Sequence, residues 1–286
     1  MSKTPQPGIL QPLPSLGRHL ILRLTVDAEI KRARAGIDDL AIDENIVVGL
    51  GAPLTLALKL KRPGLRAFPA LAAAHVAVPS TQQALWCWLK GSDRGELVHR
   101  GRKIVEQLGS AFQVDEVLDT FQYADSRDLS GYVDGTENPV GPKAKKAALL
   151  PDGSSFVAVQ KWLHDLHHFL ALPGRQRDHI IGRRQRDNQE LADAPASAHV
   201  KRTAQEKFSP PAFILRRSMP WTSGEQSGLQ FVAFGRSLDT YETLLRHMLG
   251  LDDGIVDGLF RFSRPLTGGY YWCPPCSGGR LVLKSR

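Results

Sequence analysis

The sequence predicts an α+β fold built from two halves of similar order. In the first half, the apolar run HLILRLTV is followed by DAEIKRARAGIDDL, in which Ile30, Ala33 and Ile37 recur at helical spacing, and then by the apolar run NIVVGLG. In the second half, the strand-like runs SFVAVQKW, FILRRS and LQFVAFGRS precede LDTYETLLRHMLG, whose pattern is helical. We therefore expect each half to be an antiparallel sheet with helices against one face.

The first half is completed by the β-like run HVAVPS and by RGELVHRGRKIVEQLGSAF, where one helical face carries Leu97, Ile104, Val105 and Leu108. Because a polar loop at 131–153 follows, we expect the division to fall between residues 1–130 and 131–286, with a ligand site at this seam. Residues 1–18 carry four prolines and two glycines, which is typical of an extended arm rather than a packed element.

Composition narrows the class of protein. A hydrophobic content of 42% in 286 residues is enough for a real core, and no apolar run is long enough to span a membrane or to act as a secretory signal. We therefore expect a cytoplasmic protein. Cys273 and Cys276 form a CPPC motif without a second pair, so a four-ligand zinc site is not expected.

The basic charge does not indicate nucleic-acid binding. The net charge is +8, yet the basic clusters GRRQR and KAKK contain no interleaved aromatic residues. A solvated basic face that attracts anionic small molecules is the better interpretation, and we expect no nucleic-acid partner.

The stretch GYVDGTENP, residues 131–139, can be interpreted in two ways. Asp134-Gly135 and Asn138-Pro139 are both frequent turn pairs, so the local pattern alone favours a turn. Asp134 would be an active-site acid if other residues of the chain required a carboxylate beside them.

Three later motifs supply such residues. IIGRRQRDNQELADAPASAHVKR contains His199, FILRRSMPW contains Arg216, and FRFSRPLTGGYYW follows near the end. Together with GYVDGTENP, and in this order, they resemble the dye-decolourising peroxidases, haem enzymes of the dimeric α+β barrel superfamily. The resemblance covers nearly the whole chain. Within the family, the chain looks most similar to the compact bacterial group called class B or P-type.

The resemblance implies two ferredoxin-like halves, one haem b per chain, hydrogen peroxide and organic one-electron donors as substrates, and a homo-oligomer. His199 in SAHVKR matches the proximal iron ligand of the family. Asp257 matches the carboxylate that accepts from the other ring nitrogen, although Asp252 and Asp253 are close enough in sequence to compete. Three other histidines, in WLHDLHH, lack the motif context of His199: His164, His167 and His168.

On the opposite side of the haem, the resemblance assigns Asp134 as acid and base and Arg216 as the charged donor. Arg217 should point to the other face of its strand, toward bulk solvent. Ser218 stands where some relatives carry an asparagine that faces the peroxide, which argues against carrying over manganese- or lignin-directed activity. The residues expected to contact haem are Gly135, Thr136, His199, Arg216 and Ser218.

Other functions stay open on sequence grounds. The same pocket could store or deliver haem, or release its iron, without turning over peroxide. A second alternative is an anion- or nucleic-acid-binding protein built on ferredoxin-like halves. The tail CSGGRLVLKSR has a Gly-Gly hinge and a short apolar patch, so it could dock to an encapsulating shell, as some relatives do. The five tryptophans and five tyrosines are candidates for electron relay, but ordinary packing is the favoured interpretation.

Overall fold

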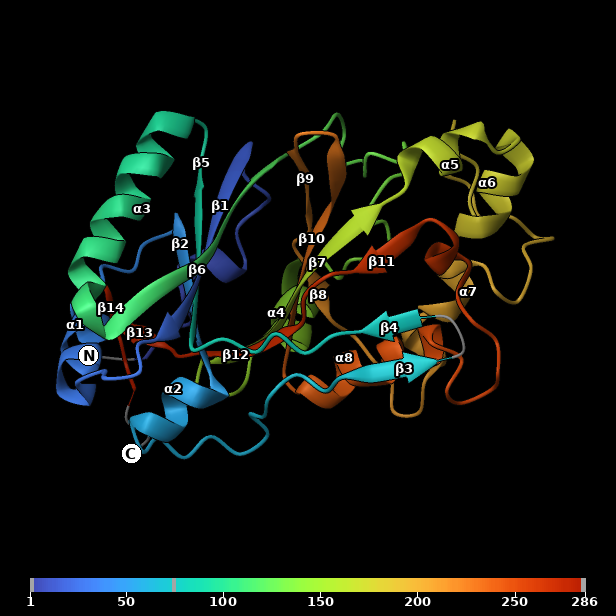
Figure 1. Ribbon diagram of the computed structural model, residues 1–286. Coiled ribbons are helices and arrows are strands. Elements are labelled where there is room, and N and C mark those ends of the chain that lie inside the picture. Colours follow the sequence, from blue (N-terminus) through green and yellow to red (C-terminus); the bar gives the residue numbers. More distant parts are fainter. Residues whose placement is uncertain (1–2, 74–75, 284–286) are drawn as a thin grey trace.

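The computed structural model describes residues 3–73 and 76–283 (Figure 1). The last three residues of the tail that could dock to a shell lie outside these ranges. The first half contributes β1 (Leu16–Leu24), α1 (Ile30–Asp38), β2 (Ile46–Gly51), β5 (Leu85–Gly91), α3 (Arg94–Leu108) and β6 (Phe112–Phe121). The second contributes β7 (Ser155–His164), β8 (Leu215–Arg216), β9 (Met219–Ser223), β10 (Gln226–Gly235), α8 (Leu238–Met248) and β12 (Gly269–Cys273).

Shorter elements connect these strands. They are η1 (Pro7–Ile9), α2 (Ala52–Ala57), β3 (Leu71–Ala73), β4 (Val76–Val78), η2 (Gly109–Ala111), α4 (Gly141–Ala148), α5 (Leu166–Ala171), α6 (Gly174–Ile181), α7 (His199–Arg202), η3 (Gln205–Lys207), η4 (Gly258–Arg261), β11 (Ser263–Pro265), β13 (Cys276–Ser277) and β14 (Arg280–Leu281). In Figure 1 the β3–β4 hairpin reaches away from the first half toward β11, which it contacts through β4.

The two halves share one strand order. In the first, the strands run β6-β1-β5-β2, and in the second β12-β7-β10, with β8 and β9 both pairing along the far side of β10. All of these pairs are antiparallel. Each half thus has its first strand between its last and its third, which is the ferredoxin-like arrangement. The expected α+β fold is confirmed.

The halves join edge to edge. β12 pairs with β2 through Tyr271↔Gly51 and Trp272↔Leu50, which makes one ten-stranded sheet. The outer strands β6 and β9 also meet, because the Thr120 hydroxyl donates to Met219 Sδ over 3.6 Å. The sheet therefore curls so that its two ends come together, and each half supplies one side of the closure.

The core of the first half follows the predicted helical face. Leu97, Ile104 and Leu108 on α3 are buried against the sheet. α3 begins where the Asp93 carboxylate accepts from the Glu96 N–H and ends at Gly109, whose φ of +64° favours glycine. The first half is therefore a filled two-layer unit.

The N-terminal segment is not an unpacked arm, and that expectation is wrong. Gln6 and Ile9 are fully buried. The Gln6 amide donates to Val48 O (2.8 Å) and Pro274 O (3.0 Å), and its carbonyl oxygen accepts from Val48 N–H. A single side chain thus satisfies backbone groups of β2 and of the segment after β12, so the segment packs despite its prolines.

Two smaller observations complete the fold. Cys273 and Cys276 are both free and buried. Among the helices of the described ranges, none has both the length and the apolar content needed to cross a membrane.

Candidate functional site

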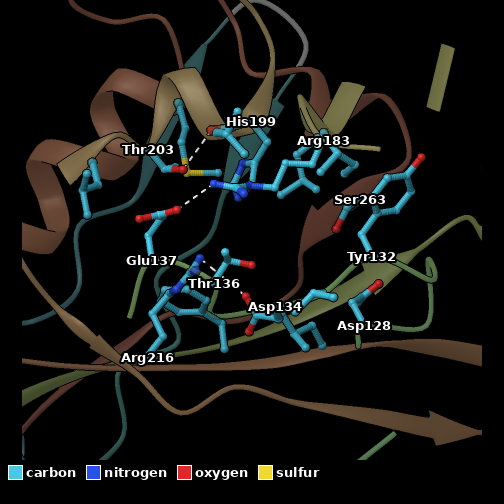
Figure 2. Close-up of a pocket in the computed structure, with 18 of the residues that line it drawn as sticks. Asp128, Tyr132, Asp134, Thr136, Glu137, Arg183, His199, Thr203, Arg216 and Ser263 are labelled. Atoms are coloured by element: carbon cyan, nitrogen blue, oxygen red, sulfur yellow. Dashed lines mark hydrogen bonds and ion pairs between the residues drawn. The ribbon is translucent and has the colours of Figure 1, made fainter. Parts of the chain in front are cut away.

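The second half contains a cavity of about 270 Å³. Its walls come from β7, β10, α7, α8 and the loops before α4 and after α6. Much of the lining is apolar: Trp162, Ile181, Leu229, Phe231, Leu244, Met248, Leu259 and Phe262. Charged and polar side chains converge on it from several elements, as Figure 2 shows. A cavity that combines an apolar lining with convergent polar groups is typical of a small-molecule or cofactor site.

The loop of residues 126–138 brings Asp134 to this cavity. Asp134 N–H donates to Ser126 O (3.0 Å), and Gly131 and Gly135 have φ of +89° and +78°. These left-handed conformations suit glycine, and they lie on either side of Asp134. The motif is therefore a turn, and the turn directs Asp134 into the cavity.

Asn138 of the same motif fixes the strand that carries Arg216. Its amide donates to Arg216 O (3.0 Å), and its oxygen accepts from Arg216 N–H (2.8 Å). Arg216 Nη1 then lies 3.5 Å from Asp134 Oδ1. The sequence motif thus holds both members of the pair, although they are far apart along the chain.

The Asp134–Arg216 contact leaves much of the guanidinium unused. A separation of 3.5 Å is long for a charged hydrogen bond. Arg216 Nε is also buried and has no hydrogen-bond partner among the described residues. A partly buried cation whose buried Nε–H has no acceptor favours an anionic or polar ligand in the cavity.

His199 reaches the cavity from the opposite side, at the start of α7 (Figure 2). Its Nδ1 lies 2.8 Å from Oδ2 of Asp257, which is 1% exposed. The other oxygen of Asp257 accepts from Leu259 N–H (2.8 Å). Since an ionised carboxylate only accepts, Nδ1 carries the proton, and in the neutral ring Nε2 keeps the lone pair that a metal ligand requires.

The two competing carboxylates lie elsewhere. Asp253 accepts from Arg202 at 2.7 and 2.8 Å, and Asp252 lies 3.8 Å from Arg246. Neither contacts His199 in the structure. Asp257 is therefore the acceptor for this ring.

The remaining predicted residues divide between two cavities. Thr136 lines the large cavity, and its hydroxyl accepts from the Asn188 amide (2.9 Å). Gly135 and Ser218 instead line a smaller cavity of about 20 Å³, which Asp134 and Arg216 also border. Ser218 Oγ accepts weakly from Val232 N–H at 3.4 Å.

The expectation that Arg217 points into bulk solvent is wrong. Its Nη2 donates to Leu10 O (3.2 Å), its Nη1 donates to Arg216 O (3.2 Å), and its Nε is buried. The cause is the packed N-terminal segment, which covers this face of the strand. Burial accordingly lowers the pKa of the Arg217 guanidinium.

Sequence reasoning missed a second polar group on the cavity wall. His164 ends β7 and lies between Ser263 Oγ (2.7 Å from Nδ1) and Asp128 Oδ1 (3.0 Å from Nε2). All three residues line the large cavity. The available signal was the two-residue period of a strand, which places Gln160, Trp162 and His164 on one face of β7.

Comparisons with known proteins indicate one family. A family model described as Dyp-type peroxidase, C-terminal, matches residues 125–278. The dye-decolorizing peroxidase of Mycobacterium tuberculosis is 32% identical over 224 residues, which is 73% of this chain and 66% of that protein. The dye-decolorizing peroxidase of Rhodococcus erythropolis is 36% identical over 183 residues, which is 60% of this chain and 54% of that protein. The chain thus spans at most about two thirds of the length of these curated relatives.

Solved structures match over more of the chain. A putative dyp-type peroxidase protein from Shewanella oneidensis has a TM-score of 0.90 at 28% identity, covering 96% of this chain and 97% of that one. A DypB variant from Rhodococcus jostii, solved in complex with haem, has a TM-score of 0.86 at 30% identity and covers 95% and 96%.

Proposed function

The chain belongs to the Dyp-type peroxidase family, and on that premise we propose that it binds haem b and reduces hydrogen peroxide at the expense of dyes, phenols or other organic one-electron donors. The observation that carries the proposal is the placement of His199 on one side of an apolar cavity and of Asp134 with Arg216 on the other.

The cavity residues fit a haem group. His199 offers an unprotonated Nε2, and the apolar lining suits a porphyrin face. Arg183 lines the same cavity with a side chain that is 11% exposed, and it would have to exchange its contacts with Glu137 (2.7 Å) and Glu190 (3.2 Å) to hold a propionate. Thr136 would contact the group from the loop side, whereas the predicted haem contacts of Gly135 and Ser218 have less support, because both residues line the smaller cavity. When bound, haem supplies the iron that takes up oxidising equivalents and passes them to donors one electron at a time.

Asp134 would move the proton of the reaction. It would accept a proton from one oxygen of hydrogen peroxide and return it to the other oxygen, so that the departing group leaves as water. With two electrons and two protons supplied by the organic donors, one hydrogen peroxide gives two molecules of water.

Arg216 would act by its charge. Its guanidinium cannot be deprotonated, and it lies beside Asp134, where negative charge develops as the O–O bond breaks. Because the main chain of Arg216 is already held by Asn138, the strand that carries the guanidinium needs no reorganisation.

Asp257 would tune the proximal side. By accepting the Nδ1 proton of His199, it fixes the tautomer and increases the basicity of Nε2. A more basic imidazole stabilises the ferric state of haem.

The same proposal includes the chain's organisation and setting. We place the division into halves at 130/131, which is supported by the strand sets β1–β6 before it and β7–β12 after it. A cytoplasmic location is supported by three free cysteines, and a homo-oligomer by family resemblance. An encapsulating shell stays a candidate partner for the tail.

A haem store or iron-releasing protein is the alternative. The contrary observation is the partly buried guanidinium of Arg216 beside the carboxylate of Asp134, because a carrier does not need this pair and removing it from water is unfavourable.

The test is to mix the haem-loaded protein with hydrogen peroxide and a dye. We expect a ferric haem spectrum and peroxide-dependent loss of dye colour. A protein that binds haem but bleaches dye no faster than free haem would favour the carrier.

A further inference from the structure

We propose that Asp128, His164 and Ser263 form a positioning relay that holds the loop carrying Asp134 in place opposite His199. None of the three is assigned a part in the function proposed above. The inference rests on that function only in taking Asp134 as the proton-transferring group.

The relay begins in the turn directly before Asp134. Asp128 Oδ2 accepts from Ser130 N–H (2.6 Å). In the main chain, Asp128 N–H donates to Tyr132 O (2.9 Å), and Asp128 O accepts from Gly131 N–H (2.8 Å). One residue thus closes the turn with both its side chain and its main chain. Asp134 follows two residues after this closure, so its direction depends on the turn.

His164 connects this turn to the sheet. It is the last residue of β7 and stands opposite Ser263 of β11 in the strand register. Its Nε2 lies 3.0 Å from the second oxygen of Asp128, and its Nδ1 lies 2.7 Å from Ser263 Oγ. In the neutral ring, Nε2–H donates to the carboxylate and Nδ1 accepts the Ser263 hydroxyl proton. The loop is therefore tied to two strands through one imidazole.

Burial makes this link stiff. The side chain of His164 is 4% exposed and that of Asp128 is 14% exposed. Burial works to raise the pKa of Asp128, but the His164 ring and the Ser130 hydrogen bonds outweigh it, and the pKa lies below its ordinary value. A buried carboxylate that stays charged is strongly disfavoured away from its partners, so the turn has little freedom to shift.

A second anchor acts on the other side of the loop. Tyr132 OH donates to Asp178 Oδ1 (2.6 Å) on α6, and Arg127 Nη1 donates to Gly131 O (2.8 Å). Loss of the relay should therefore loosen the loop without releasing it altogether. Misplacing a reacting group by about 1 Å can reduce a rate about 10²-fold.

The first experiment measures the reaction of haem-loaded protein with hydrogen peroxide by stopped flow. We expect His164→Gln and Asp128→Asn each to slow it by about ten- to a hundredfold, with haem content unchanged. Ser263→Ala, which leaves the Asp128–His164 contact in place, should have a smaller effect. The control is Glu116→Gln. This change removes the carboxylate partner of Lys161, which lies on β7 like His164 but does not line the cavity.

A double mutant separates positioning from general damage. If the relay acts through Asp134, His164→Gln combined with Asp134→Asn should react within about twofold of Asp134→Asn alone, because coupled residues are not additive. If the two losses instead multiply, His164 does not act through Asp134 and the relay is rejected.

The second readout uses protein prepared without haem. Backbone amides of residues 126–134 should exchange with deuterium faster in His164→Gln than in wild type, and at the wild-type rate in Glu116→Gln. Unchanged exchange in both relay variants would overturn the proposal. Should Asp134→Asn itself react like wild type, the proposed role of Asp134 fails, and the exchange rates alone decide whether the relay holds the loop.

Discussion

The two halves share one strand order, yet only the second contains the large cavity. In the first, the connection between the first and second strands, 25–45, carries the single helix α1, and apolar side chains such as Leu22 and Ile37 fill the space over the sheet. In the second, the corresponding connection, 165–214, runs outward through α5, α6 and α7. His199 lies on this longer connection, and Arg216 lies just after it. The longer connection at one point of the repeated topology thus supplies the residues that form a site above the second sheet.

The largest difference between the halves is expected on removing the side chain of His199, which lies on the long connection. His199→Ala should fold but lose most of its haem, because the other described imidazole on this cavity, His164, has both ring nitrogens engaged, whereas His199 pairs through Nδ1 alone. Absorption spectra and haem content check the result. His168→Ala, an exposed histidine of α5 on the same connection, should retain haem fully.

The next largest effect should come from the pair opposite His199. Arg216→Leu should slow the reaction with hydrogen peroxide by about 10²–10³-fold, as loss of a preorganised charged donor does. Asp134→Asn should slow it no more than this, since a water molecule can partly replace the carboxylate in proton transfer. Both variants should retain haem, and stopped-flow rates decide. Wild-type rates in both would refute the assignment of this pair.

A smaller effect on turnover is expected at Asp257. Asp257→Asn should raise the Fe(III)/Fe(II) potential, because the weaker acceptor leaves His199 a poorer donor to ferric iron. Potentiometry measures the shift. Asp253→Asn, whose carboxylate pairs with Arg202 instead, should leave the potential unchanged.

The first half should show the smallest effect on turnover. Leu22→Ala removes a fully buried side chain and should lower the free energy of unfolding by about 2–5 kcal/mol. The rate per folded, haem-loaded molecule should stay at the wild-type value, which urea unfolding and stopped flow together can test. A rate loss in this variant would show that the filled half also controls the site.

The features that depend on local sequence pattern were predicted from the sequence. The strand-helix order of the halves follows from hydrophobic periodicity, and the candidates Asp134, His199 and Arg216 stand in long, ordered motifs. Gly131 and Gly135 matched positive φ angles, as a turn over a ligand requires.

The features that were not predicted depend on contacts with residues that are distant in the sequence. Gln6 is buried because β2 and the segment after β12 both leave backbone groups for it, and no pattern near residue 6 reveals them. His164 shares WLHDLHH with two exposed histidines, and only its contacts with Asp128 and Ser263 distinguish it. Asp257 was separable from Asp253 only once the fold had turned the 250–257 loop toward α7.

The edge-to-edge junction of the halves has a consequence for synthesis on the ribosome. β2 is buried along its whole length, yet the strand that covers its outer edge, β12, is made more than two hundred residues later. At about 5–20 residues per second, that edge waits on the order of ten to forty seconds for its partner. During this interval the nascent chain exposes an apolar strand able to pair with other chains, so a chaperone that shields Ile46–Gly51 should raise the yield of folded protein.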